Sequence, residues 1–389
     1  MDHDNKPKVS IIVPVWNAER HLKGCFDSLR RQTYENIEII FSDDGSSDGS
    51  SEMLSRFAAA DPRVKVLHQE NKGIAEARNA GLKACSGKYV MFMDDDDLVP
   101  KSYVEKFLCL IEGSGAHVAV GGYRRVTEDM KLLETRRIVG PGTHVKCGGC
   151  RRVSEHRKLH KTGRLFGSGT HVKCESCRSV SEHRILHKTG RLFGSGTHLK
   201  SGSGTDWLRY ILVVPWGKIY RKSFLDDACA EFLPSSIDED MYFWLKLLSY
   251  YPKIAFTDYA GYVWVKHPDS VSNTLHRRTC SGSDIIPPLE KVLDMYDERD
   301  VYLDYFIYRH CVRNFLYTSR GESREVIVKE FKRIQEWLLK NDCSLKICPF
   351  SPRLSGERVD HRLAVFCLWL TGRFHGEGLL SFLISRCVG

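Results

Sequence analysis

The stretch YVMFMDDDD, residues 89–97, joins five apolar side chains directly to four aspartates. An apolar run of this length predicts a buried strand of a parallel sheet, and ligands bind where such strands end. Four adjacent carboxylates repel one another unless water solvates them or a cation neutralises them. Carboxylate oxygens are ligands that Mg²⁺ and Mn²⁺ prefer. The aspartates therefore form either a divalent-cation site or a solvated acidic turn, and the neighbouring sequence has to distinguish the two.

Strands and helices alternate around this stretch with short connections. We expect further strands at 9–15, 37–41 and 64–68, and helices at 16–31, 50–60, 73–84 and 100–111. This alternation predicts an α/β fold with a mostly parallel sheet and right-handed crossovers. Carboxylates at 43–44 and 94–97 would then meet at one edge of the sheet, where a nucleotide would lie. Neither GxGxxG nor GxxxxGK[ST] occurs, so the sequence carries no dinucleotide fingerprint and no P-loop.

The composition is that of a globular protein with two or three domains. The chain has 389 residues, of which 42% are hydrophobic, and its 14 cysteines are scattered except for two CxxC pairs. Scattered cysteines suit a reducing compartment better than a disulfide framework. Residues 1–8 are polar, and no run reaches the roughly 18 apolar residues of a membrane span. We therefore expect a cytoplasmic protein.

The net charge of +9 belongs to one segment of the chain. Residues 143–200 hold 13 Lys and Arg against 3 acidic residues, whereas the rest of the chain has 45 basic and 46 acidic residues. The basic character is therefore no property of the whole molecule, and we do not expect nucleic acid as a partner.

Within this basic segment, residues 143–169 and 170–196 are tandem copies that differ at four positions. Each copy carries CxxC and then HxxxH. The candidate ligands are Cys147, Cys150, His156, His160, Cys174, Cys177, His183 and His187. Such a set can bind zinc, but the five residues between its Cys and His pairs are fewer than the roughly 12–15 of a zinc finger. Each copy ends in Gly-Ser-Gly and lacks an apolar core. These features favour a basic insertion without a fold of its own. Both interpretations stay open for the insertion, 143–204.

Four sequence blocks resemble the nucleotide-sugar-binding half of the family 2 glycosyltransferases. The blocks are VSIIVPVWNAE (9–19), IEIIFSDDGSSDGS (37–50), NKGIAEARNAG (71–81) and GKYVMFMDDDD (87–97). The resemblance implies the GT-A fold, in which a Rossmann-like, mostly parallel sheet is flanked by helices. It also implies roles for single residues. Pro14, Trp16 and Glu19 would line the nucleotide pocket. Asp44 would hydrogen-bond the base, most often uracil, and Arg78 would lie near the base or the diphosphate.

For the aspartate run, the resemblance implies a DxD element. Asp94 would face the ribose and the metal ion, and Asp96 would be the more direct ligand of Mn²⁺ or Mg²⁺. Asp95 would contact the nucleotide-sugar, and the register of the element within Asp94–Asp97 stays open by one residue. His267, in the block YVWVKHPDSVS (262–272), matches a histidine that completes the metal site in GT-A enzymes.

Two blocks after the insertion extend the resemblance. In the family, the block WGKIY (216–220) lies beside the sugar and acceptor site, so Trp216 would stack on a sugar and Lys218 would neutralise phosphate. The alternative for Trp216 is a core position. The segment IDEDMYFWL (237–245) carries the family's acidic pair, with Asp240 as the general base and Glu239 as its neighbour or substitute. The alternative for both carboxylates is a charge-complementing role at a helix N-terminus.

These expectations describe an inverting, hexosyltransferase-type enzyme. It would transfer a sugar from a nucleotide-sugar, with a UDP-sugar expected, to a hydroxyl of a glycan or lipid-linked acceptor in cell-surface polysaccharide or glycoconjugate synthesis. Residues 1–115 would form the donor half, 116–275 the acceptor half with the insertion, and 276–389 a helical C-terminal region. Apolar segments at 364–370 and 379–384 would pack on the catalytic domain or contact the inner face of a membrane. The rival interpretation is an inactive GT-A-like protein whose insertion binds a polyanion or zinc.

Overall fold

A computed structural model provides the structure. It describes residues 6–138, 204–209, 211–234, 238–267, 285–319, 322–343, 345–354 and 359–373. Within the insertion it describes four two-residue strands: β7 (Lys146–Cys147), β8 (His171–Val172), β9 (Ile185–Leu186) and β10 (Leu192–Phe193). The side chains of all eight candidate zinc ligands lie outside the described residues, and so does the apolar segment 379–384.

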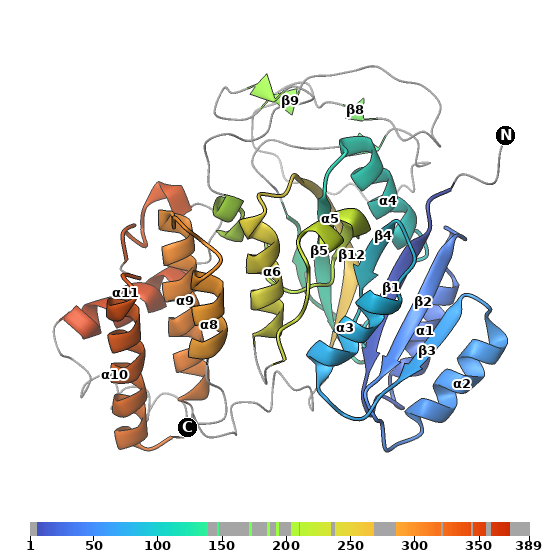
Figure 1. The fold of residues 1–389 in the computed structure, drawn as a ribbon, viewed down its shortest axis with the longest axis horizontal. Coiled ribbons are helices and arrows are strands. Elements are labelled where there is room, and N and C mark those ends of the chain that lie inside the picture. Colours follow the sequence, from blue (N-terminus) through green and yellow to red (C-terminus); the bar gives the residue numbers. More distant parts are fainter. Residues whose placement is uncertain are drawn as a thin grey trace.

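An eight-stranded sheet forms the centre of the fold (Figure 1). Its order is β12-β5-β11-β4-β1-β2-β3, and β6 pairs with β5. The strands are β1 (Val9–Val15), β2 (Ile37–Asp43), β3 (Val64–His68), β4 (Tyr89–Phe92), β5 (Val118–Thr127), β6 (Leu132–Arg136), β11 (Lys218–Arg221) and β12 (Ile254–Lys266). Among the ladders of this sheet, only those of β11 and β6 are antiparallel. The C-terminal ends of β1, β2 and β4 therefore meet the N-terminal end of β11 at one edge, which we call the site edge.

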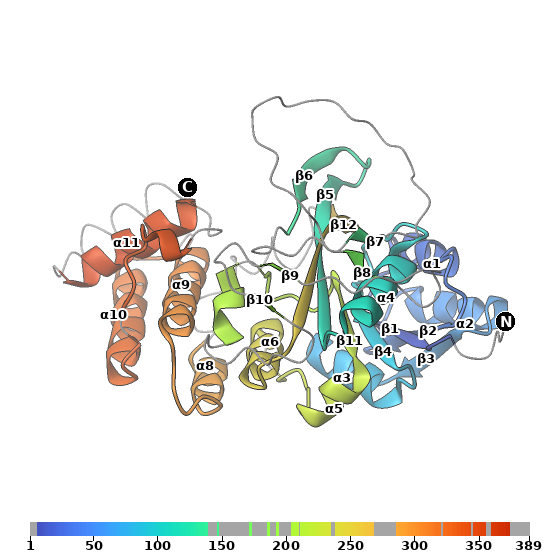
Figure 2. The same cartoon turned by 90° about the horizontal axis from the view of Figure 1, so that it is seen from above.

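Helices cover both faces of this sheet. The helices of the described residues, including those that pack beyond the sheet, are α1 (Leu22–Arg30), α2 (Ser50–Ala60), α3 (Ile74–Ala84), α4 (Tyr103–Ser114), α5 (Lys222–Asp227), α6 (Glu239–Ser249), α8 (Ile286–Leu293), α9 (Val301–Thr318), α10 (Arg324–Lys340) and α11 (Val359–Arg373). The described residues also include the 3-10 helices η2 (Gly204–Arg209) and η5 (Pro352–Leu354). Figures 1 and 2 both place α6 between the sheet and the group α8–α11.

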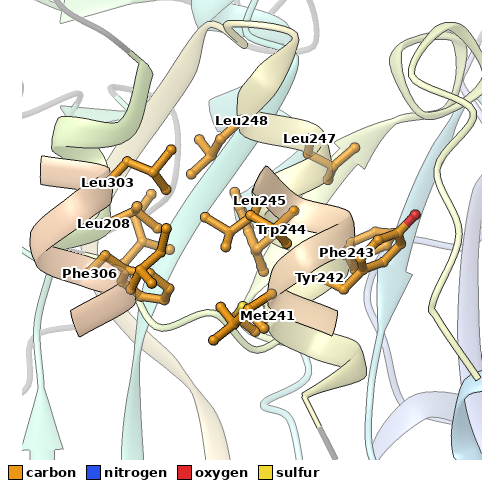
Figure 3. Close-up of a cluster of buried hydrophobic side chains, with 14 of the residues drawn as sticks. Leu208, Met241, Tyr242, Phe243, Trp244, Leu245, Leu247, Leu248, Leu303 and Phe306 are labelled. Carbon is orange, nitrogen blue, oxygen red and sulfur yellow. The ribbon is translucent and has the colours of Figure 1, made fainter. Parts of the chain in front are cut away.

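The alternation of side chains along a strand explains the two covered faces. Val9, Ile11 and Val13 of β1 belong to the buried cluster that includes α1 and α4, whereas Ile12 belongs to the cluster on the other face. That second cluster continues through α6 into the C-terminal helices, and Leu303 and Phe306 of α9 lie with Leu208, from residues 204–209, beside the apolar side chains of α6 (Figure 3). The C-terminal helices are therefore packed on the catalytic part of the chain through one continuous core.

The predicted fold class is confirmed, and several elements have their predicted bounds. β1, β3 and α2 match the expected strands and helix. The helix expected from Trp16 begins only at Leu22, because Asn17 adopts φ 51° and its backbone amide donates to Ser46 Oγ.

The predicted division of the chain does not correspond to separate sheets. β5, β11 and β12, which come from the predicted acceptor half, complete the same sheet as β1–β4. The insertion joins β6 to η2. The boundaries at 115 and 275 stay a prediction. In the part of the chain that the structure describes, no helix is both long and apolar enough to span a bilayer.

Glu38 of β2 is a buried carboxylate that ties the first strands together. It accepts hydrogen bonds from Ser10 Oγ at 2.5 Å, the Ser86 amide at 2.6 Å and Lys65 Nζ at 2.6 Å. Burial raises the pKa of Glu38, but these hydrogen bonds outweigh burial and bring the pKa from 4.5 down to about 2. Because the folded-state pKa is depressed, ionised Glu38 stabilises the fold above about pH 4.5, and this contribution is lost as the pH falls toward 2.

We therefore predict a pH-dependent effect of Glu38→Gln. At pH 7 the substitution should lower the free energy of unfolding by up to about 3 kcal/mol, and at about pH 3 the loss should shrink to about half or less. Urea unfolding at the two pH values measures the difference. Glu52→Gln, at an exposed position on α2, is the matched control and should change little at either pH. An equal loss at both pH values for Glu38→Gln would contradict the charge argument.

Candidate active site

The four aspartates that follow β4 have different surroundings. The Asp97 carboxylate is buried and accepts hydrogen bonds from the Tyr262 hydroxyl at 2.6 Å and the Val265 amide at 2.8 Å. The side chains of Asp94 and Asp96 each keep 29% of their surface exposed. Asp97 is thus engaged in holding this loop against β12, whereas Asp94 and Asp96 reach solvent at the site edge.

Asp95 connects the aspartate run to the loop after β1. The backbone amide of Trp16 donates to Asp95 Oδ2 at 3.4 Å. The Trp16 side chain is 54% exposed, whereas Pro14 is buried at the end of β1 beside Ser42 of β2. The structure therefore brings Trp16 and Asp95 together at the site edge and leaves the indole available to a planar ligand.

The aspartate run concentrates negative charge. Burial raises the pKa of Asp96 to about 6, and repulsion from Asp94 adds to the shift. Burial and then repulsion from Asp96 and Asp94 raise the pKa of Asp95 well above its ordinary value. A cation near these oxygens would relieve the repulsion, and hard carboxylate oxygens suit Mg²⁺ or Mn²⁺. Among the described residues, no three His, Cys, Asp or Glu side chains already converge on one point. The fit to a cation therefore rests on the donor chemistry of Asp94 and Asp96.

His267 follows β12 and lies next to the aspartate run. Its Nε2 is 3.9 Å from Asp96 Oδ2, and its Nδ1 is 2.7 Å from Glu128 Oε1. The ring is buried and lies 3.9 Å from the ring of His21, centroid to centroid. The structure thus brings together two of the predicted metal ligands, and the carboxylate of Glu128 orients the imidazole from its other nitrogen.

Arg78 of α3 joins the aspartate run to the acidic pair of α6. Its side chain is only 3% exposed. Its Nη2 donates to Asp94 Oδ1 at 3.1 Å, and its Nη1 donates to Glu239 Oε1 at 3.0 Å and to Asp240 Oδ1 at 2.7 Å. The guanidinium also lies over the Phe232 ring, 5.2 Å from its centroid. Burial disfavours the charged guanidinium, but attraction to the three carboxylates outweighs it and raises the pKa of Arg78. The charged guanidinium of Arg78 is therefore the shared counter-ion of three carboxylates.

Glu239 and Asp240 form the start of α6, where the positive end of the helix dipole favours carboxylates. Their side chains are 15% and 24% exposed. Burial raises the pKa of Asp240 well above its ordinary value, while Arg78 opposes the shift. A raised pKa makes an ionised carboxylate a stronger base, which suits proton acceptance.

Asp44 and Glu19 organise the loops at the other end of the site edge. The buried Asp44 carboxylate accepts hydrogen bonds from the Lys72 and Gly73 amides, both at 2.8 Å, and so ties the end of β2 to the start of α3. Glu19 accepts a hydrogen bond from the Gly49 amide at 3.1 Å, just before α2. Their predicted contacts with the nucleotide stay predictions.

Trp216 and Lys218 lie in the core beside the site. The Trp216 indole stacks on Tyr262, with 4.3 Å between centroids and 6° between planes. Lys218 Nζ donates to the carbonyls of Val214 and Trp216. Burial lowers the pKa of Lys218 to about 7, against the attraction of Asp240. Trp216 thus has the core position of the alternative interpretation, and contact with a sugar or phosphate stays a prediction for both residues.

Sequence reasoning assigned no role to Tyr262 or Phe232. The Tyr262 hydroxyl accepts a hydrogen bond from the Asp94 amide at 3.1 Å and donates one to Asp97, so it holds the aspartate run from β12. Phe232 forms the apolar support under the Arg78 guanidinium. No sequence signal distinguishes these aromatics from other core residues, because both contacts join segments far apart in the chain.

Known sequences that resemble this chain are described as glycosyltransferases. Residues 10–182 match the model of the family described as Glycosyl transferase family 2. Glycosyltransferase GlyA of Streptococcus pneumoniae is 45% identical over 121 residues, which are 31% of this chain and 17% of GlyA. Putative glycosyltransferase EpsH of Bacillus subtilis is 44% identical over 102 residues, which are 26% of this chain and 30% of EpsH. This chain thus spans less than a third of the length of either relative.

Solved structures extend the comparison to the whole fold. TarS 1–349 of S. aureus, in complex with UDP-GlcNAc, aligns with a TM-score of 0.55 at 17% identity, covering 95% of this chain and 92% of TarS 1–349. At that identity the likeness concerns the fold, and it confirms the GT-A architecture with a helical C-terminal region. The ordered blocks at the site edge and the family match show that residues 10–182 have the sequence of glycosyl transferase family 2, and the shared architecture shows that they lie in a GT-A fold.

Proposed function

We propose that this protein is an inverting glycosyltransferase that transfers a sugar from a nucleotide-sugar to a hydroxyl group. One observation carries the proposal. Arg78 holds Asp94 of the predicted DxD element in the same hydrogen-bonded group as Glu239 and Asp240. Transfer needs the donor diphosphate and the general base on opposite sides of one anomeric carbon, and this group supplies carboxylates for both tasks within one site.

Asp240 is the general base in this proposal. Its carboxylate takes the proton of the acceptor hydroxyl while the hydroxyl oxygen attacks the anomeric carbon and the bond to the nucleoside diphosphate breaks. A single displacement inverts the configuration at that carbon and requires no enzyme nucleophile. Glu239 shares Arg78 Nη1 with Asp240, so the guanidinium orients both carboxylates before the acceptor arrives.

Asp94 and Asp96, with His267 beside Asp96, are the residues that would hold Mn²⁺ or Mg²⁺. A cation bound there would neutralise negative charge on the leaving diphosphate. The protein prepares the position of these carboxylates, because Tyr262 bonds the Asp94 amide and the buried Asp97 anchors the loop.

A UDP-sugar is the donor that we propose to test first. TarS of S. aureus, which shares the fold, has crystal structures in complex with UDP and with UDP-GlcNAc. The exposed Trp16 ring and the buried Asp44 carboxylate, which follow neighbouring strands, offer a stacking surface and a hydrogen-bond acceptor for a base. The proposed acceptor is a hydroxyl of a glycan or lipid-linked glycan. Contact of the C-terminal region with the inner face of a membrane stays a prediction.

The direct test is nucleotide release from a panel of UDP-, GDP- and dTDP-sugars in the presence of Mn²⁺. We expect one donor to be turned over and Asp240→Asn to lower kcat by about a hundredfold or more, because Asn cannot accept the proton. UDP affinity should change little. Asp258→Asn, which removes a carboxylate on the exposed part of β12, is the control. Release from no donor, or full activity of Asp240→Asn, would reject the proposal.

The cation site is tested by Asp96→Asn. The substitution removes a negative oxygen ligand of the cation. The factor by which Mn²⁺ strengthens UDP binding should therefore fall by about tenfold or more. Calorimetric titration of UDP with and without Mn²⁺ measures this without any turnover. Asp129→Asn, at an exposed position between β5 and β6, should retain the enhancement. Undiminished enhancement in Asp96→Asn would place the cation elsewhere.

The charge balance is tested by Arg78→Met. Without the guanidinium, Asp94, Glu239 and Asp240 lose their shared counter-charge, and the free energy of unfolding should fall by about 3–5 kcal/mol at neutral pH. Denaturant unfolding measures the loss. Arg56→Met removes an exposed i,i+4 pair with Glu52 and should cost less than about 0.5 kcal/mol. Equal stability of Arg78→Met and the wild type would show that the three carboxylates need no shared cation.

A further inference from the structure

One face of α9 leads from the core under α6 to the start of that helix. Leu303, Phe306 and His310 are spaced i, i+3 and i+7, so they share a face of α9. Leu303 and Phe306 are buried in the cluster that covers α6, and Figure 3 shows them beside Leu208, facing the side chains of α6. His310 continues this face by about one further turn.

His310 contacts the residue that precedes the acidic pair. Its Nε2 lies 3.0 Å from Asp238 Oδ2, and the two side chains are 13% and 17% exposed. Neither atom has a hydrogen-bond partner of regular geometry among the described residues, so each is the polar neighbour of the other. The His310 ring also stacks on Phe306, with centroids 5.8 Å apart and 16° between planes. The ring is therefore fixed from one side while its nitrogen meets Asp238.

Asp238 has an unusual conformation for its place in the helix. An aspartate at an N-cap ordinarily has an extended backbone and accepts a hydrogen bond from an amide of the first turn. Asp238 instead has φ 66° and ψ 16°, in the left-handed region, and its side chain makes no capping hydrogen bond. A residue with a Cβ adopts this region at a cost in free energy. A contact with a distant helix thus takes the place of the local cap.

The first turn of α6 is consequently held from two sides. Arg78, from the donor half, bonds Glu239 and Asp240. His310, from the C-terminal region, contacts Asp238, whose carbonyl accepts the Tyr242 amide at 3.0 Å. Because Asp238 and Glu239 share a peptide bond, a change in the Asp238 backbone would turn the carboxylates that follow it.

We propose that His310 is a positioning residue for the reaction. It holds Asp238 in the left-handed conformation and thereby sets the direction of the Glu239 and Asp240 carboxylates. The inference rests on the proposed function of Asp240 as general base. His310 acts only through Asp238. A misplacement of a reacting group by about 1 Å can cost on the order of a hundredfold in rate. A substitution of His310 should therefore lower the reaction rate far more than it changes the UDP affinity or the stability of the protein.

The experiment compares His310→Ala and His310→Gln in the full chain, with the donor that the panel identifies. His310→Ala should lower kcat by about tenfold to a hundredfold and change the Kd of UDP by less than about twofold. His310→Gln keeps an N–H group directed to Asp238 and should recover part of kcat. Arg313→Ala, on the exposed side of α9, is the matched control and should retain the wild-type kcat.

Hydrogen–deuterium exchange supplies a readout that needs no turnover. The Tyr242 amide should exchange faster in His310→Ala, because its acceptor is the Asp238 carbonyl, while the amides of β1 keep their wild-type protection. Unchanged protection of Tyr242 would overturn the proposal. General loss of protection that includes β1 would also overturn it, because His310 would then support the fold as a whole.

The same experiment separates this inference from the proposed function. Full activity of Asp240→Asn would remove the base assignment, whatever His310 does. An inactive Asp240→Asn together with a fully active His310→Ala would leave the base in place and reject the positioning role alone.

Discussion

A buried guanidinium must have counter-charge close by, and in this protein that requirement brings the site together. Arg78 is almost completely covered, and its two terminal nitrogens bond carboxylates from the loop after β4 and from the start of α6. Removing a charge from water is costly unless partners and hydrogen bonds compensate for it. The three carboxylates provide that compensation, and they in turn depend on Arg78 because they would otherwise repel one another. The separation between the aspartate run and the acidic pair is therefore determined by the size of one guanidinium.

The helix that carries the acidic pair is also the link between the parts of the protein. On one side α6 meets the sheet and Arg78, and on the other its apolar side chains share a core with η2 and α9. The Tyr296 hydroxyl adds a hydrogen bond to the Leu245 carbonyl at 2.7 Å. The C-terminal helices are consequently part of the support of the proposed base, and the His310 contact with Asp238 extends this support to the residue next to the pair.

Much of the fold could be predicted because its signals are local. β1, β3 and α2 have their expected bounds, since short segments rich in β-branched residues and a Ser-Asp-Gly turn require no knowledge of distant partners. The start of α1 could not be predicted in this way. Asn17 leaves the helical region to bond Ser46 after β2, and that contact depends on the parallel pairing of β1 with β2. The four aspartates show the same limit, because only packing against Tyr262 and Val265 separates Asp97 from its neighbours.

The sequence by itself determined the resemblance of the donor half to the family, the order of strands and helices in that half, and the two groups of carboxylates. These follow from the periodicity of apolar residues and from motifs whose members are close in the chain. The tertiary structure alone decided how those groups meet: Arg78 and Asp240 are 162 residues apart yet 2.7 Å apart in space. It also decided that Trp216 stacks on Tyr262 in the core and that α9 reaches Asp238. The physical reason is the same in each case. Burial of charge and packing of aromatic rings are satisfied between segments that the fold brings together, so no local pattern can encode them.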